Sequence, residues 1–168
     1  GNNNFEYDLV DICRQALADQ GRKQYLKAMA DYKSFSRQEF KKDSDRFLKM
    51  ILLQDKLLGT RQEFRLGHWI EEARSLGKTA EEKDLYEWNA RVQITTWGNR
   101  ICADNGGLHD YGHKEWQGVL KDFYYLRWST FMKSPASQLS LQDTPRIDWY
   151  GLEEPWTLQK NPYSSKAE

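Results

Sequence analysis

Apolar side chains recur at intervals of three and four residues through most of the first 133 residues of the chain. This spacing puts them on one face of an α-helix, and no stretch of useful length shows the strict alternation that a β-strand needs. Short connections between the expected helices favour antiparallel neighbours. We therefore predict an all-α fold, an antiparallel bundle of about five main helices with a short, less regular C-terminal tail.

Five helices are expected from this spacing and from the residues that begin or end them. They cover about 5–35, 80–97 and 110–133, with two more between Ser36 and Gly77. Three pairs have the capping-box pattern, in which a hydroxyl residue precedes a carboxylate by three positions: Ser36 with Glu39, Thr60 with Glu63, and Thr79 with Glu82. Residues 145–156 favour one more short helix, docked through Trp149 and Leu152.

The length of 168 residues is that of one domain, long enough to bury a core without disulfides or metals. We expect residues 1–168 to form a single helical domain. Residues 1–4 are interpreted as a disordered start or a cloning scar, and residues 161–168 as a frayed end. The first helix is expected to bury an apolar stripe made of Leu9, Ile12, Cys13, Ala16 and Leu17.

The charges of the chain are balanced, with 25 Lys and Arg against 25 Asp and Glu. Such a balance gives no general attraction to a phosphate backbone, so no nucleic-acid partner is expected. No apolar run approaches the roughly 20 residues that cross a bilayer, so no membrane span is expected either. The two cysteines, Cys13 and Cys102, say little about the redox compartment.

One connection between expected helices, residues 97–116 (WGNRICADNGGLHDYGHKEW), concentrates polar and aromatic side chains. His109 and His113 lie four positions apart, a spacing at which two imidazoles share a metal. A metal needs a further ligand, for which the sequence offers Asp104, Asp110 and His68. No glutamate lies between the histidines as in HExxH and no cysteine cluster supports them, so we favour hydrogen-bonding or solvent-facing histidines and expect no metal or other cofactor.

The glycines of this connection, in Asn105-Gly106-Gly107, favour a turn with positive φ over a phosphate-binding loop, because no strand precedes them and no Gly-Lys-Ser/Thr follows. The aromatic residues are more informative. A pyranose ring stacks its C–H face on Trp or Tyr, while its hydroxyl groups need fixed polar partners. The segment holds both kinds of group. The alternative is that Trp97, Tyr111 and Trp116 are core residues that anchor a loop.

Adjacent carboxylates occur three times, at Glu71-Glu72, Glu81-Glu82 and Glu153-Glu154. Neighbours on a helix point about 100° apart, so they cannot converge on one glycosidic bond. We interpret all three pairs as solvated helix faces. The sequence therefore offers no catalytic residue.

Several ordered blocks of the chain resemble a known family. They are YDLVDICRQAL (7–17), FRLGHWIEEAR (64–74), YEWNARVQITTWG (86–98) and DYGHKEWQGVLKDFYYLRW (110–128). In this order they are similar to the C-terminal helical domain of α-N-acetylglucosaminidases, glycoside hydrolase family 89. The EEPW block at 153–156 resembles the bacterial branch of the family.

The resemblance implies a parent enzyme with a small N-terminal α/β domain, a catalytic (β/α)8 barrel and this helical domain packed against the barrel. Family members remove terminal α-linked N-acetylglucosamine from glycans with retention, using two glutamates of the barrel. Neither glutamate lies in this chain, so we expect it to be inactive alone. Its implied partners are the barrel and a glycan ending in α-linked N-acetylglucosamine. Trp97, Asp110 and Tyr111 are expected to bind substrate at the barrel mouth.

The match weakens over residues 99–109, where animal members of the family have a shorter connection, so the resemblance assigns no role to His109. Arg91 and Arg127 match family positions, and we interpret them as buried or interhelical ion-pair residues. The location of this chain stays open, while the resemblance implies a bacterial parent that is secreted, periplasmic or at the cell surface.

A second class of function is an independent carbohydrate- or protein-binding helical module, which the aromatic content of 14% and the balanced charge also favour. Under the family interpretation, the face that docks on the barrel should expose more apolar area than a monomer usually tolerates, so we expect the chain to self-associate.

Overall fold

The structure is a computed structural model that describes residues 3–134 and 147–167. Throughout these ranges the regular structure is helical, apart from one isolated β-bridge between Arg65 and Gln117. The predicted all-α class is confirmed. In the same ranges, no helix has both the length and the apolar character that a membrane crossing requires.

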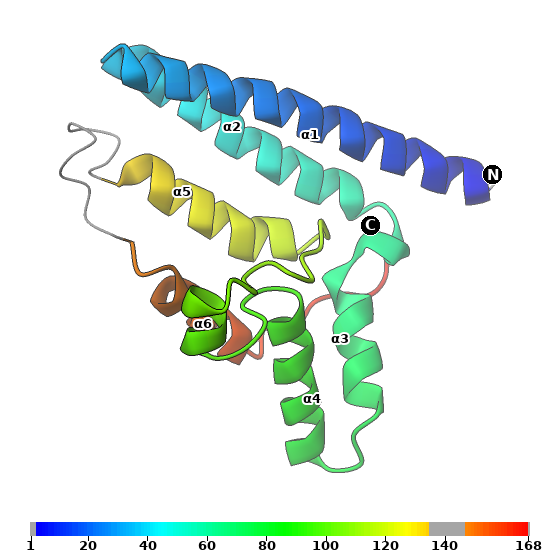
Figure 1. The fold of residues 1–168 in the computed structure, drawn as a ribbon. Helices are drawn as coiled ribbons and strands as arrows, with labels where there is room; N and C mark the ends of the chain where they lie inside the picture. The colour runs from blue at the N-terminus through cyan, green and yellow to red at the C-terminus, as the bar shows by residue number, and fades with distance from the viewer. Residues whose placement is uncertain (1–2, 135–146, 168) are drawn as a thin grey trace.

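The first two helices form an antiparallel hairpin along one edge of the molecule (Figure 1). They are α1 (Asn3–Lys33) and α2 (Arg37–Leu58). Asn3 and Asn4, which we expected to be disordered or a cloning scar, belong to α1, while residues 1–2 lie outside the described part of the chain.

The side of α1 that packs on α2 differs from the predicted stripe. Val10, which lies outside this stripe, is buried, whereas Leu9 and Ile12 are exposed. The predicted burial of these two side chains is therefore wrong. The physical reason is that the main contact of α1 is with α2, and these two side chains lie on a side of α1 that this contact does not cover.

A second hairpin, α3 (Leu66–Ser75) and α4 (Ala80–Gln93), extends away from the first (Figure 1). A 3-10 turn, η1 (Gln62–Phe64), joins α2 to α3. The Thr79–Glu82 capping box is formed at the start of α4. This helix ends four residues before the predicted boundary, and its outer face is exposed at Leu85 and Trp88.

The C-terminal half adds two π-helical turns, η2 (Ile101–Asn105) and η3 (Leu120–Tyr124), and two helices, α5 (Tyr125–Lys133) and α6 (Trp149–Leu158). The predicted helix over 110–133 begins only near residue 119, because Gly118 adopts a φ of 93° that a helix cannot contain. The preceding residues form an irregular loop. The short helix predicted within residues 145–156 is confirmed as α6, while residues 145–146 lie outside the described part of the chain.

The main core lies between three parts of the chain. These are the α3–α4 hairpin, the continuous helix made of η3 and α5, and helix α6. Its buried members are Leu66, Ile70, Ala90, Ile94, Val119, Phe123 and Trp156. Trp156, rather than the predicted Trp149 and Leu152, is the fully buried aromatic residue of α6, and its ring packs against Phe123 at 5.2 Å between centroids. A separate aromatic cluster joins α5 to the first hairpin, with Trp128 at 5.0 Å from Phe47.

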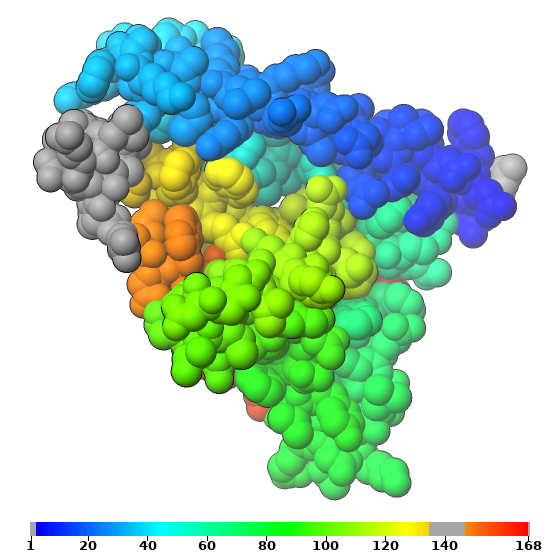
Figure 2. Space-filling model, viewed as in Figure 1, coloured from blue at the N-terminus to red at the C-terminus, as the bar shows by residue number. Residues whose placement is uncertain are grey.

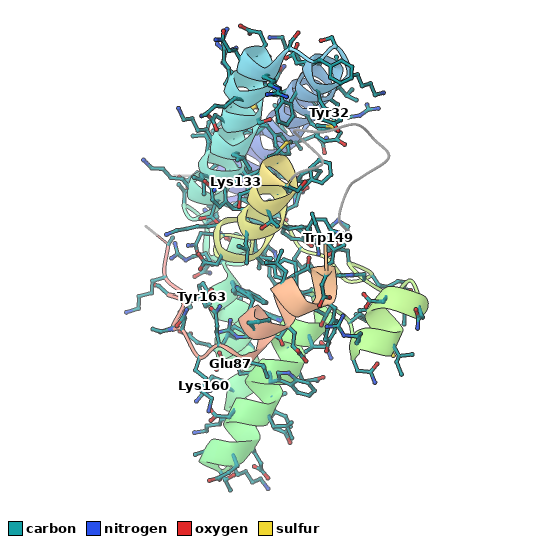
Figure 3. The ribbon with its side chains drawn as sticks, turned by 90° about the vertical axis from the view of Figure 1, so that its left-hand side faces the viewer. Tyr32, Glu87, Lys133, Trp149, Lys160 and Tyr163 are labelled. Atoms are coloured by element: carbon teal, nitrogen blue, oxygen red, sulfur yellow. The ribbon has the colours of Figure 1, made fainter. Side chains whose placement is uncertain are left out.

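Residues 161–167 have no helical structure, yet they are held by specific contacts and are not frayed as we expected. The hydroxyl of Tyr163 donates to Asp122 at 2.8 Å, and burial together with this bond raises the pKa of Tyr163 to about 12. The Nε of Arg65 donates to the carbonyl of Ser164 at 2.9 Å. Figure 3 shows Tyr163 and Lys160 following the α3–α4 hairpin past Glu87.

Candidate functional site

The 97–116 segment begins where the chain leaves α4, and it covers part of the face seen in Figure 2 (green). Trp97 stands at this exit with a φ of 64°, and its backbone N–H donates to the carbonyl of Val92 at 2.8 Å. Its ring lies 5.0 Å from that of Tyr111, tilted by 54°. Both rings are exposed, Trp97 by 37% and Tyr111 by 72%. The structure therefore joins two of the three predicted site residues in one exposed aromatic pair.

Asp110, the third predicted residue, precedes Tyr111 in the loop. We expected it at the start of a helix, but it has a φ of 61°, and its N–H donates to the carbonyl of Thr95 at 3.0 Å. The loop returns closely to α4 after this point, since a Cβ atom on Gly112 would lie only 2.6 Å from the carbonyl oxygen of Gln93 and 3.0 Å from the Trp97 ring. The backbone at Gly112 thus packs directly on the candidate site.

Arg127 of α5 holds Asp110 in place. Its Nη1 donates to Oδ2 of Asp110 and its Nη2 donates to Oδ1 at 3.1 Å, while the hydroxyl of Tyr124 also donates to Oδ1 at 3.1 Å. The guanidinium lies 5.0 Å from the ring centroids of Phe123 and Tyr124. The predicted role of Arg127 as an ion-pair residue is confirmed.

Glu153 of α6 is the second carboxylate on Arg127. It accepts a hydrogen bond from Nε of Arg127 and pairs with Nε2 of His109, and its side chain is only 1% exposed. The prediction that Glu153 belongs to a solvated face is wrong. The sequence does contain a sign that Glu153 is buried. It lies three residues from Tyr150 and three from Trp156, so it shares with them the side of α6 that is buried.

The electrostatics of this cluster follow from its burial and its ion pairs. Burial acts to lower the pKa of Arg127, but the hydrogen bonds to Asp110 and Glu153 outweigh it and raise the pKa. The bond to Glu153 raises the pKa of His109 above its ordinary value of 6.5, against burial and the charge of Arg127. Burial, followed by the charge of Asp110, raises the pKa of Tyr124 far above its ordinary range. Arg127 is therefore charged, and Tyr124 remains a hydrogen-bond donor.

The wide turn η3 ends three residues before Arg127 in the same continuous helix. A π-turn inserts one additional residue into a helical turn and is frequently found beside functional sites. Here it ends on Tyr124, which bonds to Asp110. The helix that bonds to Asp110 through Tyr124 is therefore irregular at this contact.

The arrangement gives no support to a shared metal on His109 and His113. These residues lie in the loop rather than on a helix; Nε2 of His109 faces Glu153, and Nδ1 of His113 lies 3.2 Å from the carbonyl oxygen of Asp110. Within the described ranges, no three His, Cys, Asp or Glu side chains are grouped closely enough to hold an ion. The predicted glycine turn is confirmed by a φ of 65° at Gly107.

Arg91, the other predicted ion-pair residue, is fully buried in α4. It donates to Glu87 at 2.6 Å and to the carbonyl of Asn161 at 3.2 Å, and its guanidinium lies about 5 Å from the rings of Trp156 and Tyr163. The prediction is confirmed, and Arg91 acts within the core rather than at the exposed aromatic pair.

The chain has relatives of known function. Residues 1–168 match the family described as the α-N-acetylglucosaminidase (NAGLU) C-terminal domain. The human α-N-acetylglucosaminidase is 30% identical over 169 residues, which cover 96% of this chain and 22% of the human protein. The chain thus spans about a fifth of the length of that relative.

Solved structures of one bacterial enzyme have the same fold. A family 89 glycoside hydrolase from Clostridium perfringens, in complex with 2-acetamido-1,2-dideoxynojirmycin, has a TM-score of 0.92 and 37% identity, over 99% of this chain and 20% of that one. A form of that enzyme with two glutamates replaced by glutamine, in complex with its substrate GlcNAc-α-1,4-galactose, has a TM-score of 0.91 and 38% identity, over 98% of this chain and 19% of that one.

The fold and the loop therefore define a helical domain of the class found in family 89 glycoside hydrolases. Because the family match extends over the whole chain, the chain belongs to the family of α-N-acetylglucosaminidase C-terminal domains.

Proposed function

We propose that this chain is the C-terminal helical domain of an enzyme that hydrolyses terminal α-linked N-acetylglucosamine from glycans with retention. In this proposal the two catalytic glutamates belong to a (β/α)8 barrel elsewhere in the parent protein, and the helical domain packs on that barrel and walls its substrate pocket. The observation that carries the proposal is the close structural match to an enzyme crystallised with GlcNAc-α-1,4-galactose.

The aromatic pair suits the role of a pocket wall. The exposed rings of Trp97 and Tyr111 can stack on the apolar C–H face of a pyranose. Asp110 is anchored by Arg127 and Tyr124, and its side chain is still 34% exposed, so a carboxylate oxygen can also accept a hydrogen bond from a sugar hydroxyl. We assign Trp97, Asp110 and Tyr111 as substrate-binding residues on these grounds.

The exposed side of α1 provides apolar area for packing against a second domain. Phe5, Leu9 and Ile12 follow one another at helical spacing, and all three are largely exposed. Burial of such side chains contributes roughly 1.5–3 kcal/mol each. This surface supports an intimate contact with the rest of the parent chain.

The proposal is tested by assaying the parent protein and this chain separately on an aryl α-N-acetylglucosaminide. The parent should release the aryl group and this chain should not. In the parent, Trp97→Ala should lower kcat/KM by about tenfold or more, because one stacking face is lost. Trp88→Ala, which removes an exposed indole of α4, should leave kcat/KM unchanged. Turnover by this chain alone, or a fully active W97A parent, would overturn the proposal.

The alternative function, an independent binding module, is favoured by a groove between α3 and α4. The groove has a volume of about 480 Å³ and is lined in part by Trp69, Tyr86, Asn89 and Gln93. Rings beside amide groups suit a neutral saccharide. Titrating N-acetylglucosamine into this chain while recording tryptophan fluorescence separates the two functions. Saturable binding that Tyr86→Ala abolishes would favour the module, whereas no binding favours a half-site that needs the barrel.

A further inference from the structure

We infer that Arg127, Glu153 and His109 form a proton-sensitive clamp that fixes the loop at Asp110 and thereby positions the Trp97–Tyr111 pair. The three are positioning residues, since their side chains bond to one another and to Asp110 and not to the exposed rings. That the fixed pair contacts a sugar rests on the proposed function. The clamp itself does not depend on it.

The first step of the argument is the backbone conformation at the site. Trp97 and Asp110 both have positive φ, at 64° and 61°, and neither is glycine. Such residues are strained and persist only where the surrounding contacts hold them. The N–H group of Trp97 donates to the carbonyl of Val92 in α4, and that of Asp110 donates to the carbonyl of Thr95 just after this helix. The exposed rings therefore stand on a strained turn that needs outside support.

The second step is the source of that support. Arg127 grips both oxygens of Asp110 and one oxygen of Glu153, so it links the loop to α5 and α6 together. A planar guanidinium can satisfy two carboxylates in this fork geometry, which a lysine ammonium cannot reproduce. Arg127 is thus the residue on which the conformation of Asp110 depends.

The third step is the charge of the cluster. The charged or titratable groups that face His109 are Glu153 from α6, Arg127 from α5 and Asp110 from the loop, with Tyr124 of η3 bonded to Asp110. When His109 is protonated, two positive groups face two negative ones. When it is neutral, a net negative charge remains beside Glu153, whose side chain is 1% exposed. Charge imbalance at a buried carboxylate is unfavourable, so loss of the proton weakens the clamp.

The titration of His109 provides the first test, by NMR of the imidazole Cε1–H signals of this chain. His109, assigned by its absence in His109→Gln, should titrate above 6.5, and Glu153→Gln should return its pKa toward that value. Glu72→Gln is the matched control, because Glu72 pairs with the exposed His68 at 3.3 Å and not with His109, so it should leave the His109 signal unchanged. The inference is overturned if the titration of His109 is the same in wild type and E153Q.

Amide hydrogen exchange at Asp110 provides the second test. Arg127→Gln should accelerate exchange of this amide by about tenfold or more, as expected when bonds to a charged group are lost. Arg127→Lys should restore part of the protection. In wild type the protection, corrected for intrinsic exchange, should fall as pH rises through the titration of His109, and in H109Q this pH dependence should vanish.

Exchange at Leu66, a fully buried core residue whose N–H donates to the carbonyl of Gln117 at 3.1 Å, monitors global folding in each variant. If R127Q does not fold, R127K and H109Q still decide the question. Equal protection of Asp110 in wild type and R127K, together with an H109Q profile that follows wild type, would overturn the clamp. Neither experiment contains a sugar, so failure of the clamp and failure of the proposed function give different results.

Discussion

Asp55, near the end of α2, caps a helix that begins just after Gly118, which lies 63 residues further along the sequence. Its Oδ1 accepts hydrogen bonds from the backbone N–H of Gly118 at 2.7 Å and from that of Lys121 at 3.0 Å. The first N–H groups of a helix have no partner within it, so a carboxylate supplied by another helix satisfies them. The same helix carries Arg127, and Asp55 therefore joins the first hairpin to the element that holds the candidate site.

We predict that Asp55→Ala lowers the free energy of unfolding by about 1–3 kcal/mol, because it leaves buried N–H groups without an acceptor. Asp55→Asn should cost much less, since its amide oxygen can still accept. The measurement is urea denaturation at neutral pH. Asp45→Ala, which removes an exposed carboxylate paired with Lys41, is the control and should stay within about 0.5 kcal/mol of wild type. An unchanged D55A would contradict the capping role.

The comparison of wild type with D55N should also depend on pH. Burial raises the pKa of Asp55 above its ordinary 3.8, although the N–H groups of Gly118 and Lys121 act to lower it. The folded state therefore binds this proton more tightly than the unfolded state. Relative to D55N, wild type should be most stable below pH 3.8 and should lose this advantage as pH rises through the pKa of the folded state. The opposite trend in urea titrations across this range would refute the assignment.

The three capping patterns show what local sequence decides. Thr79 and Glu82 form the complete box. The hydroxyl of Ser36 instead lies 3.0 Å from that of Ser34, and that of Thr60 donates to the carbonyl of Leu57. The same pattern is present in all three, so the sequence predicts the place where the chain turns. The hydrogen-bond partner of each capping hydroxyl is not predicted, because it depends on which groups the folded turn brings within reach.

The candidate site shows the same division. The family resemblance anticipated Trp97 and Tyr111 as site residues and Arg127 as an ion-pair residue, whereas residue type and spacing alone left the two aromatic residues as either sugar-binding or core residues. The partners of Arg127 could not be anticipated, because Glu153 reaches it from another helix and Asp110 through a strained loop. Periodicity reports which face of a helix is apolar, but the identity of the element opposite is set by tertiary packing.

Gly112 gives a prediction about the loop. An added Cβ would lie 2.6 Å from the carbonyl oxygen of Gln93 and 3.0 Å from the ring of Trp97, so the backbone and the indole must move apart. Gly112→Ala should cost about 1–3 kcal/mol and shift the fluorescence of Trp97, identified by comparison with Trp97→Phe. Gly21→Ala is the matched control. Its Cβ meets no atom within 4 Å inside α1, and it should stabilise the chain by up to about 1 kcal/mol. An unshifted spectrum in G112A would show that the loop does not rest on Trp97.

The exposed side of α1 leads to the last prediction, which concerns assembly. Phe5 and Ile12 are 64% and 67% exposed on a helix whose opposite side packs on α2, and Leu9 lies between them. Removing apolar side chains from water is favourable, so two copies of this chain should bury these surfaces against each other. We therefore expect concentration-dependent self-association, measured by sedimentation velocity. Replacing Phe5 with Ser and Ile12 with Lys should make it monomeric without changing its helical content. Leu76→Ser, which removes an exposed apolar side chain from the end of α3, should leave the association intact. A wild-type chain that stays monomeric at high concentration would show that α1 is not a packing surface, and the contact with a second domain would then have to be sought on another face.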